Sequence, residues 1–167
     1  MSKEIVNKVA SSQLINIDLE DFYPKGERVF FDIKDWLFAD QILKEKDFRD
    51  SVKNHDWKIY QNKYVALTCS VDAIIPFWAY LLITTKLTPF SKKIVVGDLE
   101  ALEISIFQEI IDGLLMDNYV DKPVIIKGCS KKHIPETAYV QLISKLVPIA
   151  RSVMYGEACS NVPLYKK

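Results

Sequence analysis

The sequence predicts an α/β protein in which helices cover a mostly parallel sheet of about four or five strands, in three layers. The main indication is the order βαβαβαβ over residues 63–160, where short β-branched runs alternate with longer amphipathic runs. The short runs are almost continuously apolar, as strands buried on both faces require. The length of 167 residues and the 49% hydrophobic and 26% charged content suit one globular domain, residues 1–167.

Local patterns place the elements of this core. Four strands are expected where apolar runs end at polar or glycine-containing turns, at residues 64–68, 93–96, 123–126 and 152–155. Three helices are expected between them, at residues 73–87, 99–115 and 135–147. Pro76 and Pro135 lie in first helical turns, where proline is tolerated. Asp98 is the expected N-cap of the second helix, whose apolar residues recur every four positions.

Residues 1–62 are more polar and are expected to form an N-terminal extension that covers the sheet. Within it, residues 27–33 are a candidate strand, residues 47–54 a candidate helix, and residues 23–26 a turn with proline and glycine. No glycine- or serine-rich linker separates the two parts, and no internal repeat is found at the short periods of solenoid proteins.

Charge and hydropathy exclude several classes of protein. Lysine plus arginine and aspartate plus glutamate each number 22, so the basic excess expected of a nucleic-acid binder is missing. The first 14 residues lack the apolar core of a signal peptide. The longest apolar run, residues 73–83, is too short to span a bilayer and contains Pro76. We therefore expect a cytoplasmic protein that binds neither nucleic acid nor membrane.

The most unusual feature is that serine follows all three cysteines, in the pairs Cys69-Ser70, Cys129-Ser130 and Cys159-Ser160. Each pair is expected just beyond the carboxyl end of a strand. Ligands of open parallel sheets bind at that edge. The three thiols are therefore expected to meet at one rim of the sheet. An odd number of cysteines also argues against a secreted disulfide framework.

Thiolates are soft, charged donors that bind zinc and iron–sulfur clusters. Three of them would leave one coordination position open, as in a reactive zinc site. His133, four residues after Cys129, is a candidate fourth ligand, and Asp72 and Asp98 are alternatives with oxygen donors. Hydrogen-bond partners of the sulfur atoms or of a cofactor are expected in the cap and turn residues, namely Ser70, Ser130, Ser160 and Asp72.

Two other interpretations of the cysteines remain open: simple packing as small apolar side chains, and thiol or persulfide chemistry. A small-molecule enzyme using Asp72 or Asp98 with Ser70 is a further alternative. No phosphate-binding glycine loop, dinucleotide fingerprint or serine-hydrolase elbow is found. No catalytic residue can therefore be assigned.

Several stretches resemble the bacterial family called domain of unknown function 2480, over almost the whole chain: residues 19–24, 31–37, 69–76, 127–130 and 156–165. The resemblance implies a cytoplasmic protein without an established activity. It also implies genes near those of iron–sulfur assembly by sulfur mobilisation. His133 lies outside the resembling stretches. The leading hypothesis is an accessory factor in iron–sulfur or sulfur metabolism with a three-cysteine site for zinc or a cluster, and with iron–sulfur assembly proteins as partners. The alternative is a non-enzymatic interaction module, a homodimer with structural cysteines.

Overall fold

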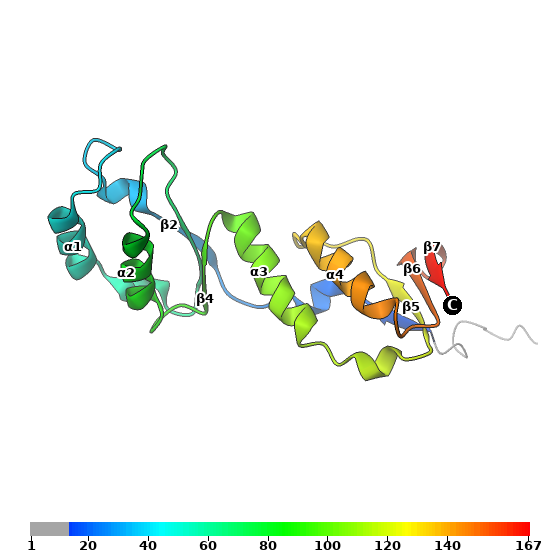
Figure 1. Ribbon diagram of the computed structural model, residues 1–167. Helices are drawn as coiled ribbons and strands as arrows, with labels where there is room; N and C mark the ends of the chain where they lie inside the picture. The colour runs from blue at the N-terminus through cyan, green and yellow to red at the C-terminus, as the bar shows by residue number, and fades with distance from the viewer. Residues whose placement is uncertain (1–13) are drawn as a thin grey trace, which may run out of the picture. The chain divides into compact units, whose positions relative to one another are not determined.

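The computed structural model describes residues 14–167, and it confirms the α/β class with parallel strands and crossover helices (Figure 1). Contacts within the chain group into two compact units. Among the described residues, unit 1 comprises residues 14–23 and 107–167, and unit 2 comprises residues 24–106. We expected one domain divided near residue 62. Instead, unit 2 is an insertion between two segments of unit 1.

Unit 2 is built around a three-stranded parallel sheet in the order β2-β3-β4, formed by Arg28–Asp32, Tyr64–Thr68 and Lys93–Val96. Helices α1 (Glu45–Asn54) and α2 (Phe77–Leu87) contribute to the core on one face of this sheet. On the other face, Glu103 of α3 (Leu99–Asp112) forms an ion pair with Arg28. This unit therefore has the three-layer arrangement of helix, sheet and helix.

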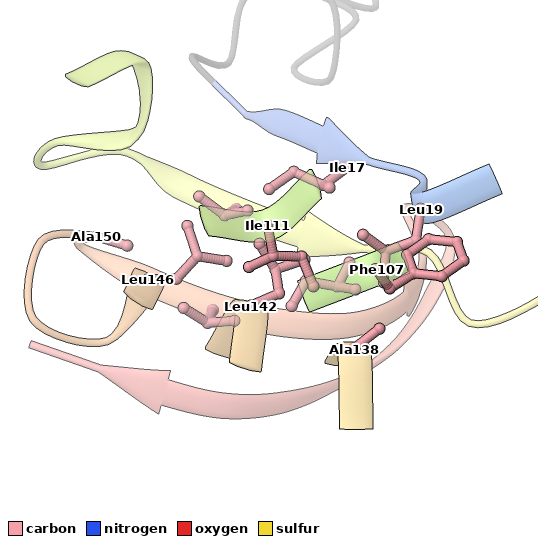
Figure 2. Packing of buried hydrophobic residues seen from close by; sticks show 11 residues of the cluster. Ile17, Leu19, Phe107, Ile111, Ala138, Leu142, Leu146 and Ala150 are labelled. Atoms are coloured by element: carbon pink, nitrogen blue, oxygen red, sulfur yellow. The ribbon is translucent and has the colours of Figure 1, made fainter. Parts of the chain in front are cut away.

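Unit 1 contains a four-stranded sheet in the order β1-β5-β6-β7. Its strands are Ile15–Ile17, Pro123–Ile126, Ser152–Glu157 and Ser160–Lys166, and only β7 is antiparallel to its neighbour. Residues of α4 (Glu136–Leu146) and of the C-terminal part of α3 pack on the sheet. Phe107, Ile111, Leu142 and Leu146 belong to the same apolar core as Ile17 and Leu19 (Figure 2).

The sequence prediction of a single sheet is therefore wrong, because its four core strands are divided between two sheets. β3 and β4 belong to unit 2, whereas β5 and β6 belong to unit 1. The supposed N-terminal extension supplies one strand to each sheet, β1 and β2. The helix expected from residue 73 begins at Phe77 instead, because Pro76 occupies its N-cap position in an extended conformation with ψ 136°.

The two units repeat one arrangement at a spacing of 59 residues. The 3-10 turns η3 (Trp57–Tyr60) and η4 (Met116–Tyr119) begin 59 residues apart. The same distance separates the first residues of β3 and β5, of α2 and α4, and of β4 and β6. Residues 45–98 and 104–157 are identical at 12 of 54 positions, including Pro76 and Pro135. This spacing is longer than the periods of about 20–50 residues that are typical of solenoid repeats, so the sequence does not resemble a repeat protein.

Buried positions follow the same spacing. Phe48 and Phe107 are fully buried in their respective cores, as are Leu87 and Leu146. The left-handed residues Asn62 (φ 60°) and Asp121 (φ 55°) precede β3 and β5 at equivalent places. Each unit also has a preceding strand that ends in an aspartate, Asp18 after β1 and Asp32 in β2. The units are thus two versions of the same small α/β fold.

Candidate functional site

The parallel strands of unit 1 end at one rim, where the surface is hollowed. The hollow has a volume of about 400 Å³, and its polar lining comes from Asn16, Asp18, Asp21, Lys127 and Glu157. These residues belong to or follow strands β1, β5 and β6. A crevice at the carboxyl ends of parallel strands is the usual place for a ligand in such sheets.

An ion pair crosses this rim between the ends of β1 and β5. Lys127 Nζ lies 2.7 Å from Asp18 Oδ2. Partial burial acts to raise the pKa of Asp18, but the hydrogen bonds from Lys127 and from the Glu20 N–H outweigh it and leave the pKa below its usual value. The hydrogen bond and charge of Asp18 in turn raise the pKa of Lys127, with smaller contributions from Glu157 and Glu20. Both groups are therefore charged at neutral pH.

The loop after β5 is fixed by a carboxylate from the β1 end of the unit. Glu20 Oε2 accepts a hydrogen bond from the Lys131 N–H at 2.9 Å and lies 3.1 Å from Ser130 Oγ. Ser130 Oγ also accepts a hydrogen bond from the Lys132 N–H at 3.0 Å. Ser130, expected to support a sulfur atom or a cofactor, thus has a structural role in holding the loop.

Two tyrosines lie beside the Cys129 loop. Tyr155 Oη is 3.4 Å from the carbonyl oxygen of Gly128, and a Cβ at that glycine would come within 2.7 Å of the Tyr155 ring. Tyr139, one turn into α4, meets Tyr155 edge to face at 6.1 Å. Burial is the main reason why the pKa of Tyr139 is raised, followed by the nearby groups Tyr155, Asp18, Cys129 and Glu20.

The structure places two of the three cysteines in unit 1 and the third in unit 2. Cys129 and Cys159 are exposed and follow the neighbouring strands β5 and β6. Cys69 follows β3 of the other sheet, is half-buried and packs against the core of unit 2. Each cysteine lies just beyond the carboxyl end of a strand, as predicted, but Ser160 is already the first residue of β7. The expectation that they share the rim of one sheet is wrong, because β3 belongs to the sheet of unit 2.

The other predicted site residues are also divided. Ser130, Ser160 and the exposed His133 belong to unit 1, whereas Ser70 and Asp72 belong to unit 2. Within residues 14–167, no group of three or more histidine, cysteine, aspartate and glutamate side chains is arranged to hold a metal ion. The thiol groups of unit 1 are those of Cys129 and Cys159.

The rim of unit 2 shows the same construction with different partners. Asp32 Oδ1 accepts hydrogen bonds from the Ser70 N–H at 3.1 Å and from the Lys34 N–H at 3.0 Å. Burial acts to raise the pKa of Asp32, but these bonds and one from the Ser70 side chain leave it lowered. In both units, then, an aspartate at the end of the first strand is tied to the segment that follows the next strand.

Sequence reasoning missed the carboxylates Asp18 and Glu20, which complete the rim of unit 1. They lie more than 100 residues before Lys127, in the part assigned to an extension. A usable signal was present: the segment from Asp18 to Asp21 has the pattern Asp-Leu-Glu-Asp, and the segment from Asp32 to Asp35 has the pattern Asp-Ile-Lys-Asp. Each begins a 3-10 turn capped by its first aspartate.

Fold and site together define an α/β protein of two related parallel-sheet units, with an ion-paired rim and two exposed thiols on one of them. The chain belongs to the family described as "Protein of unknown function (DUF2480)", whose sequence profile matches residues 3–167. The resemblance seen in the sequence is thereby confirmed. No curated protein and no solved structure matches the chain. Among the described helices, none has the length and apolar character needed to cross a bilayer.

Proposed function

We propose that this protein is an accessory factor of iron–sulfur or sulfur metabolism in the cytoplasm, and that it acts through Cys129 and Cys159. The observation that carries the proposal is the position of these thiols. Both are exposed, both follow neighbouring parallel strands, and residues just before them, Lys127 and Ala158, line one hollow. This revises the three-cysteine hypothesis to a two-cysteine site.

Two thiolates are an incomplete set for zinc or for iron, which bind four ligands in sulfur-rich sites. The remaining positions would be filled by a donor or acceptor protein, or by a small ligand in the hollow. Such a shared site suits a factor that carries a metal briefly rather than one that stores it. The reducing cytoplasm would keep both thiols available.

The test is metal binding by the purified full chain under anaerobic conditions. We expect one zinc or ferrous ion per chain in competition with a chromophoric chelator. Cys129→Ala and Cys159→Ala should each weaken binding by more than roughly 100-fold, the upper end for loss of a mere second-shell partner. Cys69→Ala is the matched control and should bind as the wild type does. The two-cysteine site would be refuted if all three substitutions weakened metal binding equally. It would also be refuted if the wild type bound no metal in competition with the chelator.

The alternative, an interaction module with structural cysteines, is favoured by a separate observation. Cys69 packs against the core of unit 2, with Sγ 3.5 Å from the Val71 carbonyl oxygen, as a structural thiol would. Under this alternative, Cys129→Ala and Cys159→Ala leave metal retention unchanged, and only Cys69→Ala lowers stability. The same set of three variants therefore distinguishes the two functions.

A further inference from the structure

Unit 2 exposes four large apolar side chains in the two chain segments that line one hollow, and two of the four, Ile42 and Ile74, line it themselves. The exposed fractions are 55% for Phe38, 55% for Ile42, 93% for Ile74 and 71% for Phe77. The hollow beside them has a volume of about 550 Å³ and is lined by residues 41–43, residues 72–74 and Pro76. We call these four side chains and the hollow the apolar patch. Large exposed apolar patches often mark interaction sites.

Backbone contacts hold both walls of the patch in place. The Phe38 N–H donates to the Ile42 carbonyl oxygen at 2.8 Å, and the Ile42 N–H donates back at 3.1 Å. Ala39 (φ 51°) and Asp40 (φ 56°) make the tight turn between them. The Lys44 ammonium lies 3.3 Å from the centre of the Phe38 ring. Because the turn is already formed, little conformational entropy would be lost when the patch is covered.

The opposite wall ends at the start of α2. The Ala73 N–H donates to the Val71 carbonyl oxygen at 2.9 Å, and Pro76 is the N-cap of the helix. Ile74 lies between these two points. Its side chain is almost fully exposed to solvent, and the residue also lines the hollow. The patch therefore has a projecting side chain directly beside a recess.

We propose that the apolar patch is a homodimer interface, occupied by the same patch of a second copy of this chain. A two-fold interface joins a surface to itself, so a projection and the recess that receives it must both lie on that surface. Ile74 and the adjoining hollow satisfy this requirement. Each Ile74 then fills the recess of the other copy.

The charges around the patch are self-complementary as well. Asp72 lies on one wall of the hollow, and Lys44 follows Leu43 on the other. The two-fold rotation brings Lys44 of each copy toward Asp72 of the other. The chain has 22 basic and 22 acidic residues, so two copies do not repel each other through net charge. The proposal is independent of the cysteine site in unit 1.

Sedimentation of the full chain between about 1 and 200 µM tests the interface. We expect a reversible dimer in the wild type. Ile74→Asp removes two equivalent contacts per dimer and should raise the dimer dissociation constant at least about 30-fold, which corresponds to about 2 kcal/mol. Val140→Asp, at a similarly exposed position of α4, is the control and should dimerise as the wild type does. Circular dichroism and urea unfolding check that both variants are folded.

A charge exchange tests the geometry of the contact. Lys44→Glu and Asp72→Lys should each weaken the dimer, and the double variant should recover most of the loss, since the exchanged charges again attract across the interface. A wild type that stays monomeric throughout the concentration range overturns the proposal. A dimer that resists Ile74→Asp also overturns it. Additive loss in the double variant overturns the pairing of Lys44 with Asp72.

Discussion

Asp18 accepts a hydrogen bond from the Lys127 ammonium at 2.7 Å and another from the Glu20 N–H at 2.9 Å. The first bond joins β1 to β5 at the ends of two strands that already pair in parallel, Ile17 opposite Ile126. A single carboxylate thus closes the strand pair and begins the turn that carries Glu20. Asp18 therefore connects the end of β1, the end of β5 and the turn at Glu20 in the rim of unit 1.

We predict that Asp18→Asn lowers the free energy of unfolding by about 1.5–3 kcal/mol at pH 7, the range for hydrogen bonds to a charged group. The folded-state pKa of Asp18 is lowered, so its contribution is present above the unfolded pKa and disappears as the pH falls through the folded value. The variant and the wild type should therefore converge on acidification. Urea unfolding at pH 7 and pH 3 measures this, with the exposed Asp21→Asn as control. Equal losses in the two variants would contradict it.

The ion pair between Arg28 and Glu103 should matter more than any surface pair in unit 2. Arg28 Nε lies 2.5 Å from Glu103 Oε1, and the side chains are only 12% and 7% exposed. Arg28 also donates to the carbonyl oxygens of Pro24 and Gly26. Glu103→Ala leaves a buried guanidinium without its carboxylate, so we expect the free energy of unfolding to fall by about 3–5 kcal/mol.

Glu45→Ala supplies the comparison for that measurement. Glu45 pairs with Arg49 at 2.8 Å across one turn of α1, and both side chains are more than half exposed. Its removal should cost no more than about 0.5 kcal/mol, since exposed helix pairs contribute little. Chemical denaturation of both variants at the same ionic strength decides the question. Similar losses would mean that burial does not strengthen the pair between Arg28 and Glu103.

His55 should make the stability of unit 2 depend on pH. Burial lowers the pKa of His55 and outweighs the nearby charge of Asp56, which raises it. The ring lies among Phe31, Trp36 and Trp57. Because the unfolded chain binds the proton more readily, stability should fall as the pH drops below about 6.5, the ordinary histidine value.

His55→Gln should flatten this dependence between pH 7 and pH 5, and the exposed His133→Gln is the control. Denaturant midpoints measured across that range give the slope for each variant. The histidine signals of the wild type, followed by nuclear magnetic resonance, give the titration directly. A His55 signal that titrates above pH 6.5 would contradict the prediction.

Two glycines at the ends of equivalent strands should resist substitution. Gly97 (φ 142°) follows β4 and Gly156 (φ 125°) lies in β6, 59 residues later. A Cβ at Gly156 would come within 2.6 Å of the Ser160 carbonyl oxygen, and one at Gly97 within 2.9 Å of the Ala101 Cβ. Gly97→Ala and Gly156→Ala should each cost about 1–3 kcal/mol through backbone strain.

Gly113, just after α3, is the internal control for these variants. Its φ is not positive, and a Cβ there would meet its nearest neighbour at 3.4 Å. Gly113→Ala should change stability little, or raise it by about 0.4–1 kcal/mol through the unfolded state. Thermal unfolding of the three variants ranks them. A loss in Gly113→Ala as large as in the other two would show that strain is not the cause.

The sequence predicted those elements whose pattern is local. Strands β3, β4, β5 and β6 are short apolar runs, and helices α3 and α4 have regular apolar spacing. By contrast, β1 has only three residues, and β7 contains Pro163 and is largely exposed, so neither shows a strand pattern. The division into two sheets could not be predicted, because an apolar run determines that a strand is buried but not which strand it pairs with.

The candidate site was predicted in part for the same reason. The position of each cysteine after a strand follows from local sequence, and the structure confirms it. Whether Cys69 meets Cys129 depends on strand partners, which the sequence pattern does not contain. Asp18 and Glu20 were missed because their contacts with Lys127 and Ser130 join segments separated by about 110 residues.

The insertion of unit 2 sets an order of events during synthesis. Residues 24–106 form a continuous stretch, so this unit can fold as soon as it has left the ribosome. Ile15 of β1 pairs with Val124 of β5, and that partner is translated only after the whole insert. Strand β1, which is synthesised first, can therefore pair only after β5 has been synthesised. In a nascent chain stalled near residue 145, residue 106 has left the ribosome and Val124 has not, so unit 2 should resist proteolysis while β1 remains open to attack.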